Sequence, residues 1–311
     1  MRSFADRLQD SIAKTSSVLV AGCDPVIDDL PPFLLVEAAR CCTSDEAIIE
    51  HVLSAFSELF LAAIEGSVAA IKPNIAFFEQ YGLAGLGVFA KLCSAIRKKG
   101  IPLITDAKRG DIGSTASAYS AAFLGRTTVA GRAFSAFETD ALTISPFLGF
   151  DTIAPFMNDC IKYGKGLFVL VQTSNPGAKS LQGLTCEGRS VSQHVAEWLA
   201  QNADKLQGEC GWSGLGAVVG ASYPEEAQAL RTTLANNFFL IPGLGAQGAG
   251  AAQAVAGFGL RNGKRGGALV NASRGLLTGA SSNHDELLAS IRSNVARFNA
   301  ELTQALMQQM G

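Results

Sequence analysis

The chain has 311 residues, of which 48% are hydrophobic and 17% are charged, and its formal net charge is −2. This composition predicts a soluble protein with a large apolar core, and the charge gives no indication of nucleic acid or an acidic membrane as a partner. The seven cysteines include one adjacent pair, Cys41-Cys42, and no Cys-x-x-Cys pair. With no signal peptide evident, we interpret them as reduced thiols of a cytoplasmic protein and expect neither disulfides nor a metal site. No apolar run is long and clean enough to span a membrane.

Eight short apolar runs recur along the chain, and each ends in or directly before Gly, Pro, Asp, Asn or Ser. Their nearly continuous hydrophobicity is typical of strands that are buried on both faces, as in a parallel sheet. The runs cover residues 18–24, 68–74, 102–106, 141–146, 167–174, 217–221, 238–243 and 268–273.

Segments rich in Ala, Leu, Glu and Gln lie between these runs and predict helices. They cover residues 44–64, 86–99, 115–124, 191–203, 224–234 and 285–307. Alternating strands and helices predict an α/β protein whose whole chain, 1–311, forms a single-domain (β/α)8 TIM barrel. Residues 25–43 are expected to be an insertion after the first strand. An open, doubly wound sheet is the alternative, because it shows the same alternation with fewer strands.

The densest group of charges is the stretch Asp106-Ala107-Lys108-Arg109-Gly110-Asp111, which begins at the last residue of the third run. Asp106 and Lys108 are two residues apart, so in a strand their side chains point to the same face. Lys72 lies near the end of the second run, so it too is expected at the end of a strand. In a barrel, polar residues at the carboxyl ends of strands carry the function, which also singles out Asp24, Ser174, Ser273 and Arg274. A structural ion-pair cluster, with Lys72 merely extending to solvent, is the simpler alternative.

Residues 227–284 contain no Asp or Glu but include Arg231, Arg261, Lys264, Arg265 and Arg274. The loops after the last two strands often bind phosphate in this fold, and Arg274 offers a planar fork for its oxygens. We interpret Arg261, Lys264 and Arg265 as a solvated basic turn.

Two further patterns receive no function. The pattern Gly243-x-Gly245-x-x-Gly248 matches a dinucleotide fingerprint but lacks the acidic residue that should follow it. His51, His194 and His284 lie in helix-like or terminal contexts. None of them is expected near a cysteine pair or at metal-ligand spacing.

The stretch from Asp106 to Thr115, DAKRGDIGST, closely resembles the signature of orotidine 5'-phosphate decarboxylases, in particular the longer bacterial type. Further segments are similar to the same family in the same order. They are IKPNIAFFE at 71–79, TSNPGA at 173–178, VVGASYPE at 218–225, IPGLGAQG at 241–248 and VNASRG at 270–275. Asn74 and Leu244 depart from the Gln and Tyr expected there. The resemblance spans residues 18–280 and implies a barrel that converts orotidine 5'-phosphate into UMP and carbon dioxide, in the last step of UMP biosynthesis, without metal or cofactor.

The resemblance also implies a homodimer with shared active sites. Lys72, Asp106 and Lys108 would come from one subunit, and Lys108 would protonate C6 of the pyrimidine. Asp111 would come from the partner subunit, accompanied by Ile112 and Thr115. For the rest of the substrate, it implies that Asp24 binds a ribose hydroxyl and Ser174 the pyrimidine. Pro242 would open a mobile lid, and the 5'-phosphate would be held by Gln247, Ser273 and Arg274.

Two alternatives compete with this interpretation. A metal-dependent sugar-phosphate decarboxylase or aldolase shares Asp-x-Lys-x-x-Asp but should carry an acidic metal ligand in place of Lys72. A catalytically silent binder of phosphoribosyl ligands is the second alternative, and the intact Lys–Asp array argues against it.

Overall fold

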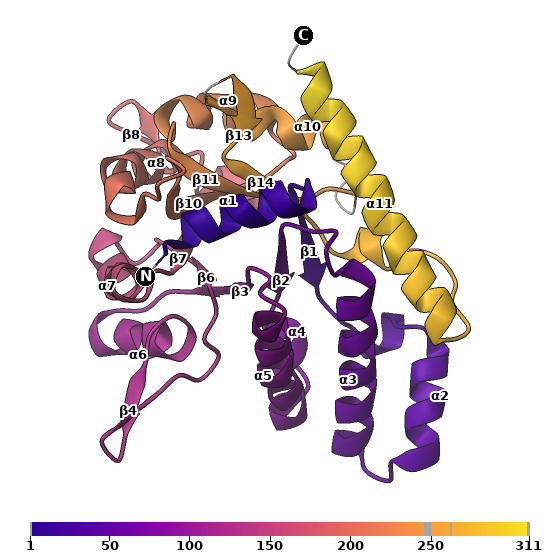
Figure 1. Cartoon of the computed structure of the whole chain (residues 1–311). Helices are drawn as coiled ribbons and strands as arrows, with labels where there is room; N and C mark the ends of the chain where they lie inside the picture. Colours follow the sequence, from indigo (N-terminus) through magenta and orange to yellow (C-terminus); the bar gives the residue numbers. More distant parts are fainter. Residues whose placement is uncertain (1, 246–249, 262, 310–311) are drawn as a thin grey trace.

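The computed structural model describes residues 2–245, 250–261 and 263–309. Eight parallel strands form one sheet in the order β2-β1-β14-β11-β10-β7-β6-β3. Two parallel bridges, Ile71 to Leu103 and Asn74 to Asp106, join the outer strands β2 and β3. The sheet therefore closes into a barrel with helices around it (Figure 1). The closure confirms the predicted TIM barrel, and the open doubly wound sheet is wrong.

All eight predicted strands are present, within a few residues of their expected bounds. They are β1 Leu19–Cys23, β2 Ala70–Pro73, β3 Ile104–Arg109, β6 Ala141–Ile144, β7 Gly166–Gln172, β10 Ser213–Val219, β11 Asn237–Pro242 and β14 Ala268–Ala272. Nearly every residue of these strands is buried, because the interior side chains meet one another and the outer ones meet helices. This two-sided burial explains why the sequence shows continuous apolar runs instead of alternation.

The six predicted helices are also present. They correspond to α3 Asp45–Ile64, α5 Gly82–Lys98, α6 Gly113–Phe123, α8 Val191–Gln201, α9 Pro224–Thr233 and α11 His284–Gln308. The structure adds α1 Phe4–Thr15, α2 Pro32–Cys41, α4 Ala76–Glu79, α7 Ala154–Tyr163 and α10 Ala251–Ala254. Helix α2 lies within the segment 25–43.

Three antiparallel hairpins were not predicted. Their strands are β4 Thr127–Val129 with β5 Arg132–Phe134, β8 Thr185–Cys186 with β9 Arg189–Ser190, and β12 Gly259–Arg261 with β13 Lys264–Gly266. Strands of two or three residues are too short to establish an alternating pattern. The third hairpin corrects the predicted solvated turn: Lys264 is exposed, but Arg261 and Arg265 are half-buried. Their guanidinium groups donate hydrogen bonds to Asn236 and to the carbonyls of Phe258 and Gln309.

Helix α3 is apolar and 20 residues long, and among the described residues it is the one helix that could cross a membrane by length and composition. It packs against α2, α5 and α11 in the outer layer of the barrel. Val52, Phe56 and Phe60 on its inner face are buried in the main core. Its hydrophobicity is therefore used within the protein.

Helix α1 closes the barrel at the amino-terminal ends of the strands. Phe4 is buried and meets the ring of Phe168 edge-on, with 6.1 Å between the ring centroids. A side chain at Gly166 would collide with the Phe4 ring, so glycine is needed there. Phe4 and Leu8 join the interior side chains of the strands in one apolar cluster. This end of the barrel is filled, which leaves the opposite end for a ligand.

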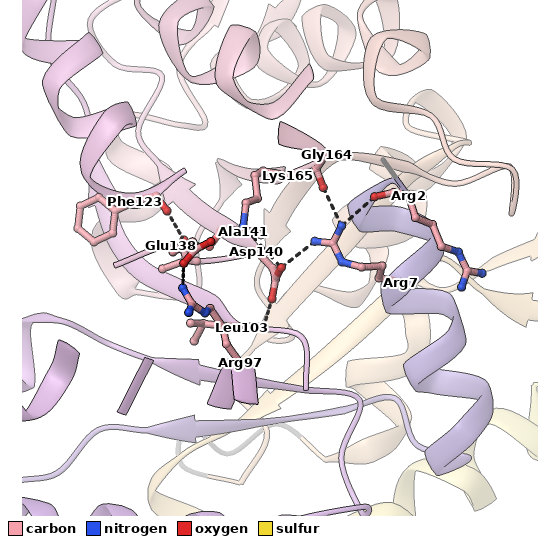
Figure 2. A network of polar contacts seen from close by, with 11 residues as sticks. Arg2, Arg7, Arg97, Leu103, Phe123, Glu138, Asp140, Ala141, Gly164 and Lys165 are labelled. Carbon is pink, nitrogen blue, oxygen red and sulfur yellow. Dashed lines mark hydrogen bonds and ion pairs between the residues drawn. The ribbon is translucent and has the colours of Figure 1, made fainter. Parts of the chain in front are cut away.

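A polar network fixes α1 to the rest of the barrel (Figure 2). Arg7 donates hydrogen bonds to the Asp140 carboxylate at 2.7 Å and to the Gly164 carbonyl at 3.0 Å. The other oxygen of Asp140 accepts the backbone N–H of Leu103 at 3.0 Å. Asp140 thereby connects the residues that precede β3, β6 and β7.

Candidate active site

A cavity of about 490 Å³ opens at the carboxyl ends of the strands, where the fold predicts a functional site. Leu170, Val218 and Leu240 form its apolar floor, one layer above the side chains that α1 closes off. Polar residues form its walls. They are Lys72, Asp106, Lys108, Thr143, Thr173, Ser174, Asn175, Gln182, Asn271, Ser273 and Arg274. An apolar floor with convergent polar groups suits a planar ring that carries polar substituents.

Lys72, Asp106 and Lys108 form a continuous charged array on one wall. Lys72 Nζ donates to Asp106 Oδ2 at 2.8 Å, and Lys108 Nζ donates to Asp106 Oδ1 at 2.6 Å. Lys72 and Asp106 are buried, whereas 49% of the Lys108 side chain is exposed. The array thus has a buried, fixed part and one ammonium group that faces the cavity.

The pKa values of the buried pair shift in opposite directions. Burial alone would raise the pKa of Asp106, but the charges and hydrogen bonds of Lys72 and Lys108 outweigh it and hold that pKa well below its usual range. Burial alone would lower the pKa of Lys72, but Asp106 and, less strongly, Asp24 raise it above its usual value. Both groups therefore remain charged at neutral pH.

Thr143 on β6 supports this array, although its sequence context did not identify it as a candidate site residue. Its hydroxyl donates to Asp106 Oδ1 at 2.9 Å and accepts the backbone N–H groups of Ala107 and Lys108 at 3.0 Å each. Lys108 has a φ of +47°, which is uncommon for a residue with a side chain. The register between β3 and β6 shifts at this point, between Thr105 and Arg109. Thr143 therefore holds the irregular backbone that turns Lys108 toward Asp106.

Asp24 follows β1 beside the array. It does not line the main cavity, but it is close enough to Lys72 to raise the pKa of that ammonium. Its Oδ1 atom is buried and accepts no hydrogen bond from the described residues. Such an acceptor is costly to leave unpaired, so Asp24 suits a ligand that supplies a donor such as a hydroxyl group.

Ser174 lines the cavity in the loop after β7, and only β6 separates that strand from β3, which carries Asp106 and Lys108. The side-chain amide of Gln182 supports this loop. Gln182 Oε1 accepts the Thr173 N–H, and Gln182 Nε2 donates to the Thr173 hydroxyl, both at 2.8 Å. Ser174 packs against Gly220, where any side chain would collide with it.

Ser273, Arg274 and Pro242 line the cavity at the ends of β14 and β11. A Cβ at Gly22 on β1 would lie 2.8 Å from the Cβ of Ser273, so glycine allows the serine to pack on that strand. Asn271 donates to the Ser273 hydroxyl at 3.2 Å. Gln247 lies outside the described residues. Arg231 is not part of this site, because its guanidinium is buried and donates to the carbonyls of Leu234, Asn237, Gly257 and Gly267.

Asp111, Ile112 and Thr115 do not line the cavity of their own chain. Asp111 is half-buried, and 62% of Ile112 is exposed. The structure therefore brings together the array of Lys72, Asp106 and Lys108, while Asp111 stays apart from it.

The expectation that no histidine lies near a cysteine pair is wrong. His51 on α3 lies beside the Cys41-Cys42 pair, with 3.7 Å between its Nδ1 atom and Cys41 Sγ. Helices α2 and α3 pack against each other and so bring together two residues that are ten positions apart in the sequence.

A (β/α)8 barrel with a buried lysine–aspartate pair at the carboxyl ends of its strands is typical of an enzyme whose active site lies at that end of the barrel. Residues 55–287 match the model of the orotidine 5'-phosphate decarboxylase / HUMPS family. The chain is 42% identical over 248 residues to the orotidine 5'-phosphate decarboxylase of Caldicellulosiruptor bescii, covering 80% of this chain and 81% of the relative. It is 41% identical over 278 residues to that of Rhodopirellula baltica, covering 88% of both chains.

Solved structures agree with these relatives. The structure of Leishmania donovani OMP decarboxylase superimposes with a TM-score of 0.70 and 29% identity, covering 98% of this chain and 99% of the other. The chain belongs to the orotidine 5'-phosphate decarboxylase / HUMPS family.

Proposed function

We propose that the Lys72–Asp106–Lys108 array is the catalytic centre with which this chain converts orotidine 5'-phosphate into UMP and carbon dioxide. Orotidine 5'-phosphate decarboxylase activity, a carboxy-lyase step of UMP biosynthesis, is the function of the chain. The observation that carries the assignment is the buried, fully ion-paired array on the wall of the cavity at the carboxyl ends of the strands.

The chemistry requires negative charge to be stabilised at one carbon atom. When the bond between C6 and the carboxylate breaks, carbon dioxide leaves and the electron pair stays on C6. The Lys108 ammonium, half-exposed to the cavity, stabilises that charge and donates its proton to C6, and solvent then reprotonates the amine. Asp106 and the buried Lys72 hold Lys108 in place, so little reorganisation is needed during the reaction.

The remaining groups bind the parts of the substrate that do not react. Ser174 hydrogen-bonds the pyrimidine, and the buried Oδ1 of Asp24 accepts a ribose hydroxyl. Ser273, Arg274 and Gln247 hold the 5'-phosphate, and Pro242 begins the loop that closes over it. Because phosphate is remote from C6, its binding energy serves to position the ring.

We also propose that two copies of the chain share their active sites, with Asp111, Ile112 and Thr115 of each copy entering the site of the other. Exposed apolar side chains support an interface there. Ile112 follows β3, while Phe147 and Leu148 follow the neighbouring β6 and are 73% and 49% exposed. The backbone N–H of Ser145 donates to the Arg109 carbonyl at 2.9 Å, so both loops leave the same edge of the barrel. We place the enzyme in the cytoplasm, in keeping with its seven free thiols.

The residues also bear on the two competing functions. A metal-dependent sugar-phosphate enzyme would need a carboxylate where Lys72 stands, and an ammonium there repels a cation. A silent binder would have no use for a buried array that is costly to desolvate.

The test is turnover of orotidine 5'-phosphate in the presence of a chelator, followed as loss of orotate absorbance. Formation of UMP and carbon dioxide without added metal is the expected result. Activity that appears only on another sugar phosphate with magnesium would contradict the proposal. Tight UMP binding without turnover would instead identify a silent binder.

A further inference from the structure

A cluster of sulfur and nitrogen atoms lies on the outer layer of the barrel, apart from the active site. Cys41 ends α2, Cys42 follows it, and His51 lies on the first half of α3. The Sγ atoms of the two cysteines are 3.6 Å apart, and Cys41 Sγ is 3.7 Å from His51 Nδ1. All three atoms lie within 4.8 Å of one another. Nothing in the proposed decarboxylation uses these residues.

The two separations measured from Cys41 match edges of a metal-centred tetrahedron. With Zn–S bonds of about 2.3 Å and Zn–N bonds of about 2.0–2.1 Å, two sulfur ligands lie about 3.8 Å apart and sulfur and nitrogen about 3.6 Å apart. The two separations measured from Cys41 are within about 0.2 Å of these values. The third pair, Cys42 Sγ and His51 Nδ1, lies within 4.8 Å, so a closing movement of at most about 1.2 Å completes the tetrahedral set.

The surroundings favour a cation with an accessible fourth position. A second cavity of about 400 Å³ opens beside the cluster and is lined by Cys42, His51, Glu50 and Glu58. The two carboxylates contribute negative potential, although Glu50 is also engaged in an ion pair with Lys91. Because Cys41 is exposed, water can reach the remaining coordination position.

We propose that Cys41, Cys42 and His51 form a binding site for Zn²⁺ or a similar thiolate-preferring divalent ion. Two thiolates and one imidazole are typical zinc ligands, and water completes the tetrahedron. On binding, two S–H bonds break, two sulfur–metal bonds form, and two protons pass to solvent. His51 coordinates through Nδ1 in its neutral form. No change of oxidation state is involved.

The proposed metal site would stabilise the fold and would take no part in decarboxylation. The ion would join the end of α2 to α3 and so fix the segment that follows Asp24. Helix α2 is already held to the start of α11, where the Glu37 carboxylate meets His284 Nε2 at 2.9 Å and Phe33 packs on the His284 ring. Metal binding would therefore stabilise α2 without altering decarboxylation.

The test uses the full-length protein in a phosphine reductant and Co²⁺ as a spectroscopic probe. We expect one equivalent of Co²⁺ to produce tetrahedral d–d bands and a thiolate-to-cobalt charge-transfer band, both removed by one equivalent of Zn²⁺. Cys41→Ser and His51→Ala should each lose these bands and the single bound ion, while their turnover of orotidine 5'-phosphate stays at the wild-type value. Turnover also shows that the variants are folded.

Cys186→Ser/His194→Ala is the matched control, because Cys186 and His194 are a second exposed cysteine–histidine pair, in which His194 Nε2 meets the carbonyl of Cys186 and not its sulfur. This variant should keep both bands. The proposal is overturned if the wild type shows no charge-transfer band, or if the Cys41 and His51 variants keep it.

Discussion

The Thr143 hydroxyl donates a hydrogen bond to Asp106 Oδ1 and thereby fixes the carboxylate that holds both lysines of the site. The same hydroxyl accepts two backbone N–H groups at the point where β3 becomes irregular. A threonine with three hydrogen bonds on a buried strand thus determines both the carboxylate position and the direction in which Lys108 points.

We predict that Thr143→Val lowers kcat by about 10- to 100-fold, because Asp106 and the backbone of Lys108 lose the hydrogen bonds that position the Lys108 ammonium, and a displacement of about 1 Å can cost about 10²-fold in rate. The backbone N–H groups of Ala107 and Lys108 that lose their acceptor should lower the free energy of unfolding by about 1–3 kcal/mol. Valine has nearly the same shape, so the barrel should remain folded. Steady-state kinetics and thermal unfolding measure the two effects separately. Thr143→Ser keeps the hydroxyl and should stay close to wild type. A valine variant with unchanged kcat would show that Thr143 has no positioning role.

Lys108→Ala should abolish turnover while leaving UMP binding largely intact. Removing the proposed proton donor is expected to cost at least about 10²–10⁴-fold in kcat. Half of the Lys108 side chain is exposed, and Asp106 keeps Lys72 as its partner, so the site should not collapse. UMP titration calorimetry and turnover measure the two properties. Lys99→Ala, which removes an exposed lysine paired with Glu65 at 2.7 Å, is the control. Wild-type turnover by Lys108→Ala would refute its role.

Asp106→Asn should invert the pH dependence of stability that comes from Lys72. In the wild type the pKa of Lys72 is raised, so its stabilisation is present below about pH 10.4 and is lost as pH rises through the folded pKa. Without Asp106, burial dominates and the folded pKa falls below the unfolded one. The variant should therefore be about 3–5 kcal/mol less stable at pH 7 and should recover stability as pH rises toward about 10.

Urea unfolding at several pH values between neutral and alkaline measures this effect. Lys72→Met/Asp106→Asn removes the titrating group, so the recovery at alkaline pH should disappear in the double variant. Parallel pH profiles for the wild type and Asp106→Asn would contradict the predicted shift.

The barrel and the charged array could be predicted from the sequence because both follow local rules. A buried parallel strand needs a continuous apolar run, and a charge directly after such a run must lie at the strand end. Lys72 and Asp106 satisfy both conditions. Helix α7 was missed because its ten residues include Pro155, Asn158 and Asp159, which have low helix propensity, although Gly164 ends it in the left-handed conformation expected of a C-cap.

The other omissions depend on contacts between distant residues. Thr143 looks like an ordinary β-branched strand residue, and only the pairing of β6 with β3 reveals its partners. His51 meets Cys41 only because α2 and α3 pack together. One signal for Thr143 was available: a polar residue at the same strand-end layer as Asp106, between the apolar residues Leu142 and Ile144.

Gly22→Ala should weaken phosphate binding by displacing Ser273. The added methyl would lie 2.8 Å from the Ser273 Cβ, and overpacking of this kind costs about 1–3 kcal/mol. If that cost falls on substrate binding, KM rises by about tenfold, since 1.4 kcal/mol corresponds to a factor of ten. Steady-state kinetics and UMP binding measure it. Gly87→Ala on α5 has open space around it and should leave KM unchanged. The double variant Gly22→Ala/Ser273→Gly removes the side chain with which the added methyl collides, and it also removes the proposed phosphate contact. Its free energy of unfolding should therefore be higher than that of Gly22→Ala. A double variant as unstable as Gly22→Ala would disprove the clash.

If the active site is shared as proposed, two inactive variants should restore activity when their chains are mixed. Lys72→Ala and Asp111→Ala homodimers each lack one group in both sites. In a mixed dimer, one site combines the intact Lys72 of one chain with the intact Asp111 of the other. Random reassociation of equal amounts should therefore give about a quarter of wild-type activity, because half of the dimers are mixed and each has one intact site of two.

Mixing Lys72→Ala with Asp106→Ala is the control, since these two residues are paired within one chain and every site would then contain a defect. Native mass spectrometry, with one of the two chains carrying a tag that changes its mass, confirms that the chains have exchanged. If Asp111 acted in its own chain, both mixtures would be equally inactive, because each mixed dimer would contain two defective sites. Recovery in the first mixture alone therefore distinguishes Asp111 acting across the interface from Asp111 acting within its own barrel.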